Sequence, residues 1–120
     1  MNSIGLLKQD FRHWAQVEQL SADSGMLSLF FKNKAFRSVA YYRMRRSGMI
    51  LRIIQRILRI LLPEQGCLYI KTSQIGGGLY IQHGFATIIT AESIGKNVWI
   101  NQQVTIGYNG DKAPIIGDNV

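Results

Sequence analysis

Apolar residues recur at helical spacing near the start of the chain. Leu7, Phe11 and Trp14 lie four and three positions apart, which places them on one face of a helix. Ser3 is the expected N-cap of this helix, because a serine side chain can accept a hydrogen bond from a free amide of the first turn. A break in the helical pattern is predicted over residues 21–25. The first segment is therefore predicted to be helical.

Two further helices are predicted before the middle of the chain. Asn33 is expected to cap a helix over residues 35–47, which stops at Gly48. Another helix is expected over residues 49–62, and Pro63 is its stop signal because proline cannot continue a helix. Together these patterns predict an N-terminal half that is entirely α-helical.

The last of these helices is amphipathic and basic. Its apolar stripe consists of Ile50, Ile53, Ile54, Ile57 and Leu61, while Arg52, Arg56 and Arg59 share another face. Residues 35–62 hold seven arginines and no acidic residue. Three interpretations remain open for residues 35–62: packing on a partner subunit, peripheral contact with an anionic membrane surface, or nucleic-acid binding. The absence of a recognition module and of interleaved aromatic residues argues against nucleic acid.

A different period begins in the second half. Isoleucines at 75, 81, 94, 100 and 106 are separated by 6, 13, 6 and 6 positions, a six-residue repeat with one extra residue. Three segments share the pattern Ile-Gly-x-x-Val or a close variant, at residues 75–79, 94–98 and 116–120. Such a repeat predicts a triangular β-solenoid, with Gly and Asn at tight corners. The alternative is a small antiparallel β domain with regular turns.

Charge and glycine divide at the same place in the chain. Residues 1–62 carry 11 basic and 3 acidic side chains, whereas residues 63–120 carry 3 and 4. Three of the 12 glycines lie before residue 63 and nine lie after it. The formal charge of +7 is therefore a property of the helical half. We predict a basic helical segment (1–62), a linker (63–67) and a solenoid (68–120).

Composition excludes several classes of protein. A hydrophobic content of 47% is too high for a disordered chain. Cys67 is the only cysteine, so no internal disulfide can form, and a reducing cytoplasm is the expected location. The start of the chain has no signal-peptide pattern, and no stretch is long and apolar enough for a membrane span. His13 has no second ligand at metal-binding spacing, and no metal site is predicted.

The solenoid segment resembles a known family. Residues 68–120 are similar to the hexapeptide-repeat acyltransferases, which form left-handed parallel β-helices, and most closely to the branch of serine and capsular-polysaccharide acetyltransferases. Two stretches carry the resemblance, Ile75-Gly-Gly-Gly-Leu-Tyr-Ile-Gln-His-Gly-Phe-Ala-Thr-Ile-Ile and Ile94-Gly-Lys-Asn-Val-Trp-Ile-Asn-Gln-Gln-Val-Thr-Ile-Gly. It extends loosely to residues 10–14 and 35–43. The implied fold class is α+β: an N-terminal α-helical segment followed by an incomplete left-handed parallel β-helix.

The same resemblance implies a reaction and its residues. Members of the family transfer acetyl from acetyl-CoA to a hydroxyl, and the histidine of their active-site coil, here His83, is the base. Histidine suits this role because its ordinary pKa lies near neutral pH. Thr105 and Gly107 are the candidates for contact with acetyl-CoA, in a groove between subunits of a homotrimer. The segment over residues 116–120 ends inside a hexapeptide motif, so we interpret the chain as C-terminally truncated and expect it to be inactive alone.

Two departures from the family pattern bear on the acceptor. Gln82 stands where serine acetyltransferases carry an acidic residue, and Ala113 stands where they carry a histidine that helps hold serine. Both changes favour a sugar hydroxyl of a surface polysaccharide over free serine, with Gln82 and Lys112 as candidate substrate-binding residues. The alternative is a solenoid scaffold or assembly module that has lost catalysis.

Overall fold

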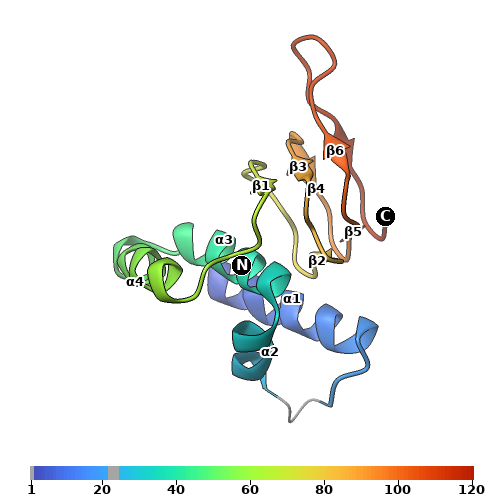
Figure 1. The fold of residues 1–120 in the computed structure, drawn as a ribbon. Helices are drawn as coiled ribbons and strands as arrows, with labels where there is room; N and C mark the ends of the chain where they lie inside the picture. Colours follow the sequence, from blue (N-terminus) through green and yellow to red (C-terminus); the bar gives the residue numbers. More distant parts are fainter. Residues whose placement is uncertain (1, 22–24) are drawn as a thin grey trace.

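A helical segment is followed by a segment of short parallel strands (Figure 1). The structure is a computed structural model, and it describes residues 2–21 and 25–120. The helices are α1 (Ser3–Val17), α2 (Met26–Lys32), α3 (Lys34–Arg45) and α4 (Met49–Leu61). The strands are β1 (Leu68–Ile70), β2 (Tyr80–Ile81), β3 (Thr87–Ile89), β4 (Ser93–Ile94), β5 (Trp99–Ile100), β6 (Thr105–Ile106) and β7 (Ile115–Ile116). The architecture is therefore α+β.

Asparagines cap the two best-defined helix starts. The side chain of Asn33 accepts a hydrogen bond from the amide of Phe36 at 3.0 Å, so the predicted cap of α3 is confirmed. The predicted cap of α1 is wrong: Asn2 accepts from the amide of Gly5 at 2.8 Å, and Ser3 is the first helical residue. α4 ends at Leu61, before Pro63, as predicted. The predicted break over residues 21–25 lies largely outside the described residues.

The strands form three parallel sheets that the chain visits in rotation. One sheet has the order β1-β3-β6, a second pairs β2 with β5, and a third pairs β4 with β7. Ile75 joins the third sheet through a parallel bridge to Ile94, which in turn pairs with Ile116. Successive passes through the same sheet are therefore stacked in parallel, as in a coil with three faces. The left hand that the family resemblance implies stays a prediction.

One corner of the coil repeats with the same backbone. Gly78, Asn97 and Asn119 all have a positive φ, at 86°, 56° and 60°. Glycine and asparagine adopt this left-handed conformation most readily, which explains the Gly and Asn positions of the repeat. The passes also approach closely, because a Cβ on Gly76 would lie 2.8 Å from the backbone of Gly95.

Helix α1 closes the first pass of the coil through a buried ion pair. Arg43 of α3 donates to the carboxylate of Asp10 of α1 from Nε and Nη2, at 2.8 and 3.0 Å. Asp10 also accepts the amides of Gly78 and Leu79, each at 2.9 Å. Burial raises the pKa of Asp10, and Arg43 and the two amides oppose that shift. The Arg43 guanidinium donates in turn to the carbonyls of Ile75 and Gly76 at 2.8 and 2.7 Å. We call this arrangement the Asp10–Arg43 clamp.

Aromatic side chains join the helices and the coil in one core. The rings of Trp14 and Tyr80 lie 4.4 Å apart between centroids, and Trp14 and Phe36 lie 5.3 Å apart. The indole nitrogen of Trp14 donates to the carbonyl of Leu79 at 2.8 Å, so the ring is satisfied in its buried position. His13 also bonds to this corner, at the carbonyl of Gly78, and so has a structural role. The two segments therefore share a hydrophobic core.

Helix α3 is central rather than superficial. All residues from Ala35 to Arg43 are buried, so most of this helix packs within the chain itself. Arg37 donates to the carbonyls of Phe30, Phe31 and Pro63 at 2.9, 2.9 and 2.6 Å. Three of the seven arginines of residues 35–62, Arg37, Arg43 and Arg46, therefore donate hydrogen bonds to backbone carbonyls of this protein.

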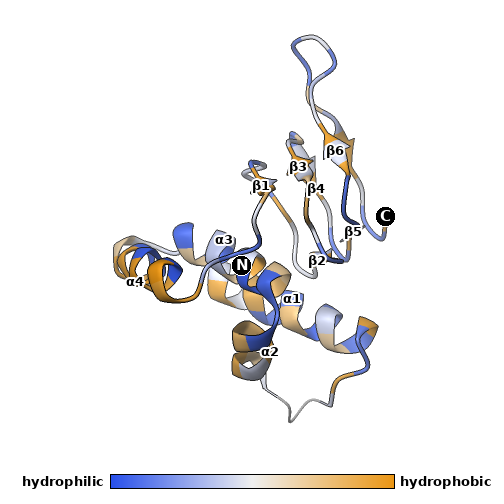
Figure 2. Ribbon diagram, in the orientation of Figure 1, coloured by the Kyte–Doolittle hydropathy of each residue, from blue (hydrophilic) through white to orange (hydrophobic). Residues whose placement is uncertain are grey.

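Helix α4 lies at the edge of the molecule, against α3 (Figure 1). Its packed side is formed by Leu51, Gln55 and Leu58, while the isoleucine stripe faces outward. In Figure 2 hydrophobic and hydrophilic residues alternate along the ribbon of α4. Among the described residues, no helix combines the length and apolar character that crossing a membrane requires.

Candidate active site

The predicted base, His83, lies at an enlarged corner of the coil. Eight positions separate Ile81 from Ile89, whereas six separate the stacked residues Ile100 and Ile106 of the next pass. The following side is one residue shorter than six, because Ile89 precedes Ile94 by five. The corner is therefore two residues longer than its counterpart in the next pass, and the side that follows is one residue shorter. Together they give the single extra residue that the spacing of the isoleucines indicates.

The backbone of this corner holds His83 outward. His83 has φ 64° and Gly84 has φ 78°, so two successive residues adopt the left-handed conformation. The amide of Gly84 donates to the carbonyl of Gln82 at 2.7 Å, which tightens the turn. A Cβ on Gly84 would approach Ile81 Cγ2 to 2.8 Å, so only glycine fits at this position. The side chain of His83 is exposed.

His83 lines a hollow of about 430 Å³ between the coil and the helices. Gln82 lines the same hollow, and Lys32 and Lys34 approach it from the junction of α2 and α3. Glu18 is also present, but its carboxylate accepts a hydrogen bond from the Tyr80 hydroxyl at 3.0 Å. The hollow is therefore lined by a histidine, three residues with side-chain amides, two lysines and a glutamate whose carboxylate is bonded to a phenol.

The phenol of Tyr80 is held in its neutral form. Burial raises its pKa to about 12, and the hydrogen bond to Glu18 and the charge of that carboxylate act in the same direction. Tyr80 consequently remains a hydrogen-bond donor at neutral pH. It fixes one wall of the hollow beside the proposed base.

Gln82 is held by the next pass of the coil. The indole nitrogen of Trp99 lies 3.2 Å from Gln82 Oε1 and 2.8 Å from Asn101 Oδ1, and it donates to both. The ring of Trp99 packs edge-on against Tyr80, with 5.0 Å between centroids. The side chain of Gln82, which follows β2, is therefore oriented by Trp99 of the neighbouring strand β5.

The other predicted site residues lie elsewhere in the chain. Thr105 and Gly107 are exposed on and after β6 and do not line the His83 hollow. Lys112 lines a separate hollow of about 720 Å³ with Glu92 and Tyr108. Its loop is closed by the amide of Asn109, which donates to the carbonyl of Lys112 at 2.8 Å. The structure brings Gln82 and His83 together and separates the remaining three from them within one chain.

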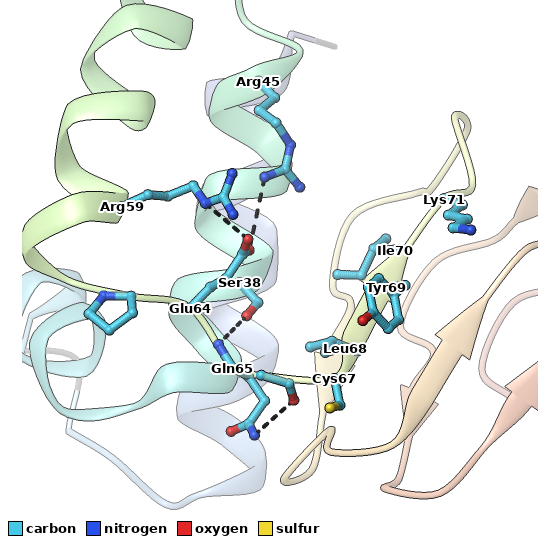
Figure 3. Close-up of a pocket in the computed structure, with 12 residues that line it drawn as sticks. Ser38, Arg45, Arg59, Glu64, Gln65, Cys67, Leu68, Tyr69, Ile70 and Lys71 are labelled. Carbon is cyan, nitrogen blue, oxygen red and sulfur yellow. Dashed lines mark hydrogen bonds and ion pairs between the residues drawn. The ribbon is translucent and has the colours of Figure 1, made fainter.

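A further hollow of about 460 Å³ lies between α3, α4 and β1 (Figure 3). Arg59 of α4 and Arg45 of α3 converge there on Glu64, with ion pairs of 3.1 and 3.9 Å. The amide of Gln65 donates to Ser38 Oγ at 2.9 Å, which holds the linker against α3. Burial lowers the pKa of Arg45, and Glu64 opposes that shift. These contacts anchor the segment that leads into the coil.

Lys32 and Lys34 were not predicted as site residues. Nothing in the local pattern marks them, because they reach the hollow only when the start of α3 packs beside β2. The Asp10–Arg43 clamp was also missed as a contact, although both residues fall in the helical stretches that carry the loose family resemblance. Among the described residues, no three His, Cys, Asp or Glu side chains are grouped so that they could hold a metal ion.

Comparison of the chain with protein-family models, with curated proteins and with solved structures gave no match.

Proposed function

We propose that this chain supplies the helical segment and the solenoid passes around His83 in an acetyl-CoA-dependent O-acetyltransferase. The observation that carries the proposal is the position of His83 on an enlarged corner, exposed to a hollow that the helices complete. In the proposed reaction the His83 imidazole takes the proton of an acceptor hydroxyl as its oxygen attacks the thioester carbonyl. The carbon–sulfur bond then breaks, and the proton leaves with the thiol of coenzyme A.

The parallel three-faced coil supports this proposal. Stacked passes of about eighteen residues are the arrangement expected of hexapeptide repeats, and the proposed coil is left-handed. Thr105 and Gly107 are proposed to meet acetyl-CoA across a boundary with a second subunit of a homotrimer, which accommodates their separation from His83 within one chain. The glycine lets a backbone amide approach the thioester carbonyl, where oxyanion charge develops.

A sugar hydroxyl is the proposed acceptor. The wall beside His83 carries the neutral amide of Gln82, and Lys32 and Lys34 add positive charge. A saccharide with an acidic group would pair with these lysines, whereas the carboxylate that lines the hollow, Glu18, is already bonded to the Tyr80 hydroxyl and is not free to hold the ammonium group of serine. Surface-polysaccharide biosynthesis in the cytoplasm is the corresponding proposed setting.

A scaffold without catalysis is the second candidate. The contact between Gln82 and Trp99 favours it, because the residue beside the proposed base is used to hold the coil together. In that case the hollow at His83 would be a by-product of the enlarged corner. The two candidates differ in one measurable property, the release of thiol from acetyl-CoA.

The test is turnover by the full-length protein with acetyl-CoA and panels of acidic sugars, neutral sugars and serine. His83→Asn is the informative variant, since asparagine tolerates the left-handed backbone but cannot act as base. We expect it to lower turnover by about 10²- to 10⁴-fold. Gln103→Asn is the matched control, at an exposed left-handed corner (φ 58°) outside the hollow, and should leave turnover unchanged. No thiol release with any acceptor favours the scaffold, and full activity of His83→Asn removes His83 as base.

A further inference from the structure

Helix α4 presents an apolar surface to solvent that is large for so short a helix. Its exposed fractions are 69% for Met49, 76% for Ile50, 50% for Ile53, 57% for Ile57, 83% for Ile60 and 74% for Leu61. We call these six residues the α4 apolar face. A contiguous apolar surface on one side of a helix marks a binding surface more often than an ordinary solvated face.

Basic side chains border this face. Arg52 and Arg56 are exposed and, in the part of the chain that the structure describes, have no ion-pair partner. Arg59 lies on the same side of the helix as Arg52 and Arg56, but it is paired with Glu64. No acidic residue occurs within α4. The helix thus offers apolar side chains together with two uncompensated positive charges.

A second copy of this chain does not complement that combination well. A two-fold contact between α4 helices would bring arginines of like charge together. Asp10 is buried, and Glu18 and Glu64 already have partners. The exposed acids of the coil are Glu92, Asp111 and Asp118, and these come from separate positions along it. The described surface therefore contains no acidic patch shaped for α4.

An anionic bilayer surface matches both properties of α4. Acyl chains receive the apolar side chains, and lipid phosphates pair with arginines at the border of the same helix. Thirteen residues span about 20 Å at the usual rise, so the helix can lie along the interface but not cross it. We propose that α4 docks this protein on a membrane rich in anionic phospholipid, through the α4 apolar face with Arg52 and Arg56. This inference is independent of the proposed acetyltransferase activity.

The structure also narrows the surface predicted from sequence. Residues 35–62 were candidates for membrane contact as a whole, but Arg37 and Arg43 are buried in contacts with backbone and with Asp10. Arg46 lies over the ring of Tyr42, 4.6 Å from its centroid. Docking is therefore assigned to α4 alone.

Sedimentation with vesicles tests the proposal on the intact protein. Wild type is expected to bind phosphatidylcholine vesicles that contain phosphatidylglycerol, and to bind them less at high salt. The double variant Ile53→Ser/Ile57→Ser should lose binding at every salt concentration. Arg52→Gln/Arg56→Gln should weaken binding about 25-fold and reduce its salt dependence, since each arginine contributes about fivefold at an anionic surface.

Two matched controls and one second measurement make the outcome decisive. Ile115→Ser removes a more exposed isoleucine (70%) from β7, and Arg12→Gln removes an exposed arginine from α1; both should bind like wild type. Lack of wild-type binding to anionic vesicles overturns the proposal, and so do equal losses in the controls. Light scattering supplies the second measurement. If wild type is an oligomer that Ile53→Ser/Ile57→Ser converts to monomers, the face belongs to a second copy and the membrane assignment is wrong.

Discussion

Helices α1 and α4 are both amphipathic, yet they use their faces in opposite ways. α1 buries Leu7 and Trp14 against the core and adds Asp10, a charged residue that is completely buried. α4 turns its isoleucines outward and buries Gln55. The difference lies in what each neighbour offers. The coil presents backbone amides to α1, whereas α4 packs against another helix, α3.

The contrast shows that the apolar face of a helix need not be its packed face. In α1, side chains with polar groups form hydrogen bonds with the backbone of the coil, so these groups lie on the packed face of the helix. In α4 the strongest apolar stripe is the part most accessible to solvent. Four changes, in order of decreasing expected effect, test this contrast.

Asp10→Ala should have the largest effect on stability. It leaves the buried guanidinium of Arg43 and the amides of Gly78 and Leu79 without their acceptor, a loss of about 3–5 kcal/mol in the free energy of unfolding. Denaturant unfolding measures it. Arg12→Gln, on the exposed side of the same helix, should change the value by less than about 0.5 kcal/mol. Equal effects of the two changes would show that the clamp does not hold α1 to the coil.

Gln55→Leu should stabilise the protein. Gln55 is 1% exposed, and within the described residues its Nε2 has no hydrogen-bond partner. Removing an unsatisfied buried donor is expected to raise the free energy of unfolding by about 1–3 kcal/mol. Arg56→Leu is the control, because Arg56 is the next residue in the helix and its side chain is exposed. This change should give no such gain in stability. A loss of stability in Gln55→Leu would contradict the packing of α4 on α3 through this residue.

Ile57→Ser should leave stability almost unchanged. The side chain is 57% exposed on α4, so its removal is expected to alter the free energy of unfolding by less than about 0.5 kcal/mol. Leu7→Ala, at a buried position on α1, should instead cost about 2–5 kcal/mol. Thermal and denaturant unfolding of both variants compare the two apolar faces directly. A large loss in Ile57→Ser would mean that the α4 apolar face is covered within the protein itself.

Glu18→Gln should produce the smallest change, a lower pKa for Tyr80. Glu18, at the C-terminal cap of α1, helps raise that pKa to about 12, although burial is the main cause. The pKa is raised in the folded state, so this contribution to stability is present below the unfolded value of 10.0 and is lost as the pH rises towards 12. Titration of tyrosinate absorbance, with Tyr80→Phe as the reference, measures the shift. An unchanged titration would show that the end of α1 is not tied to β2.

Features set by neighbouring residues were predictable from the sequence. Asn33 and Pro63 marked helix ends through local hydrogen bonding and ring geometry, and the spacing of Ile75, Ile94 and Ile116 matches residues that stack in one sheet. Contacts between distant residues were not. The partner of Asp10 lies 33 positions away, and no local pattern specifies which face of α4 packs.

The candidate site divides in the same way. Gln82 and His83 lie in one hollow because they are adjacent in the chain, but Lys32 joins them only through tertiary packing. The enlarged corner was read as one extra residue because Ile89, an inward residue of the first sheet, falls outside the six-residue spacing. A longer corner and a shorter side cancel in a simple count of positions.

The Asp10–Arg43 clamp also bears on the order in which the protein folds as it is synthesised. Asp10 accepts hydrogen bonds from the amides of Gly78 and Leu79, and it leaves the ribosome 68 and 69 residues before them. The helices can therefore assemble before the first pass of the coil has been synthesised. That pass can then fold against the packed helices. Every later pass then pairs with the one before it. The helical segment would act as the template from which winding starts, so weakening the clamp should slow folding as well as lower stability.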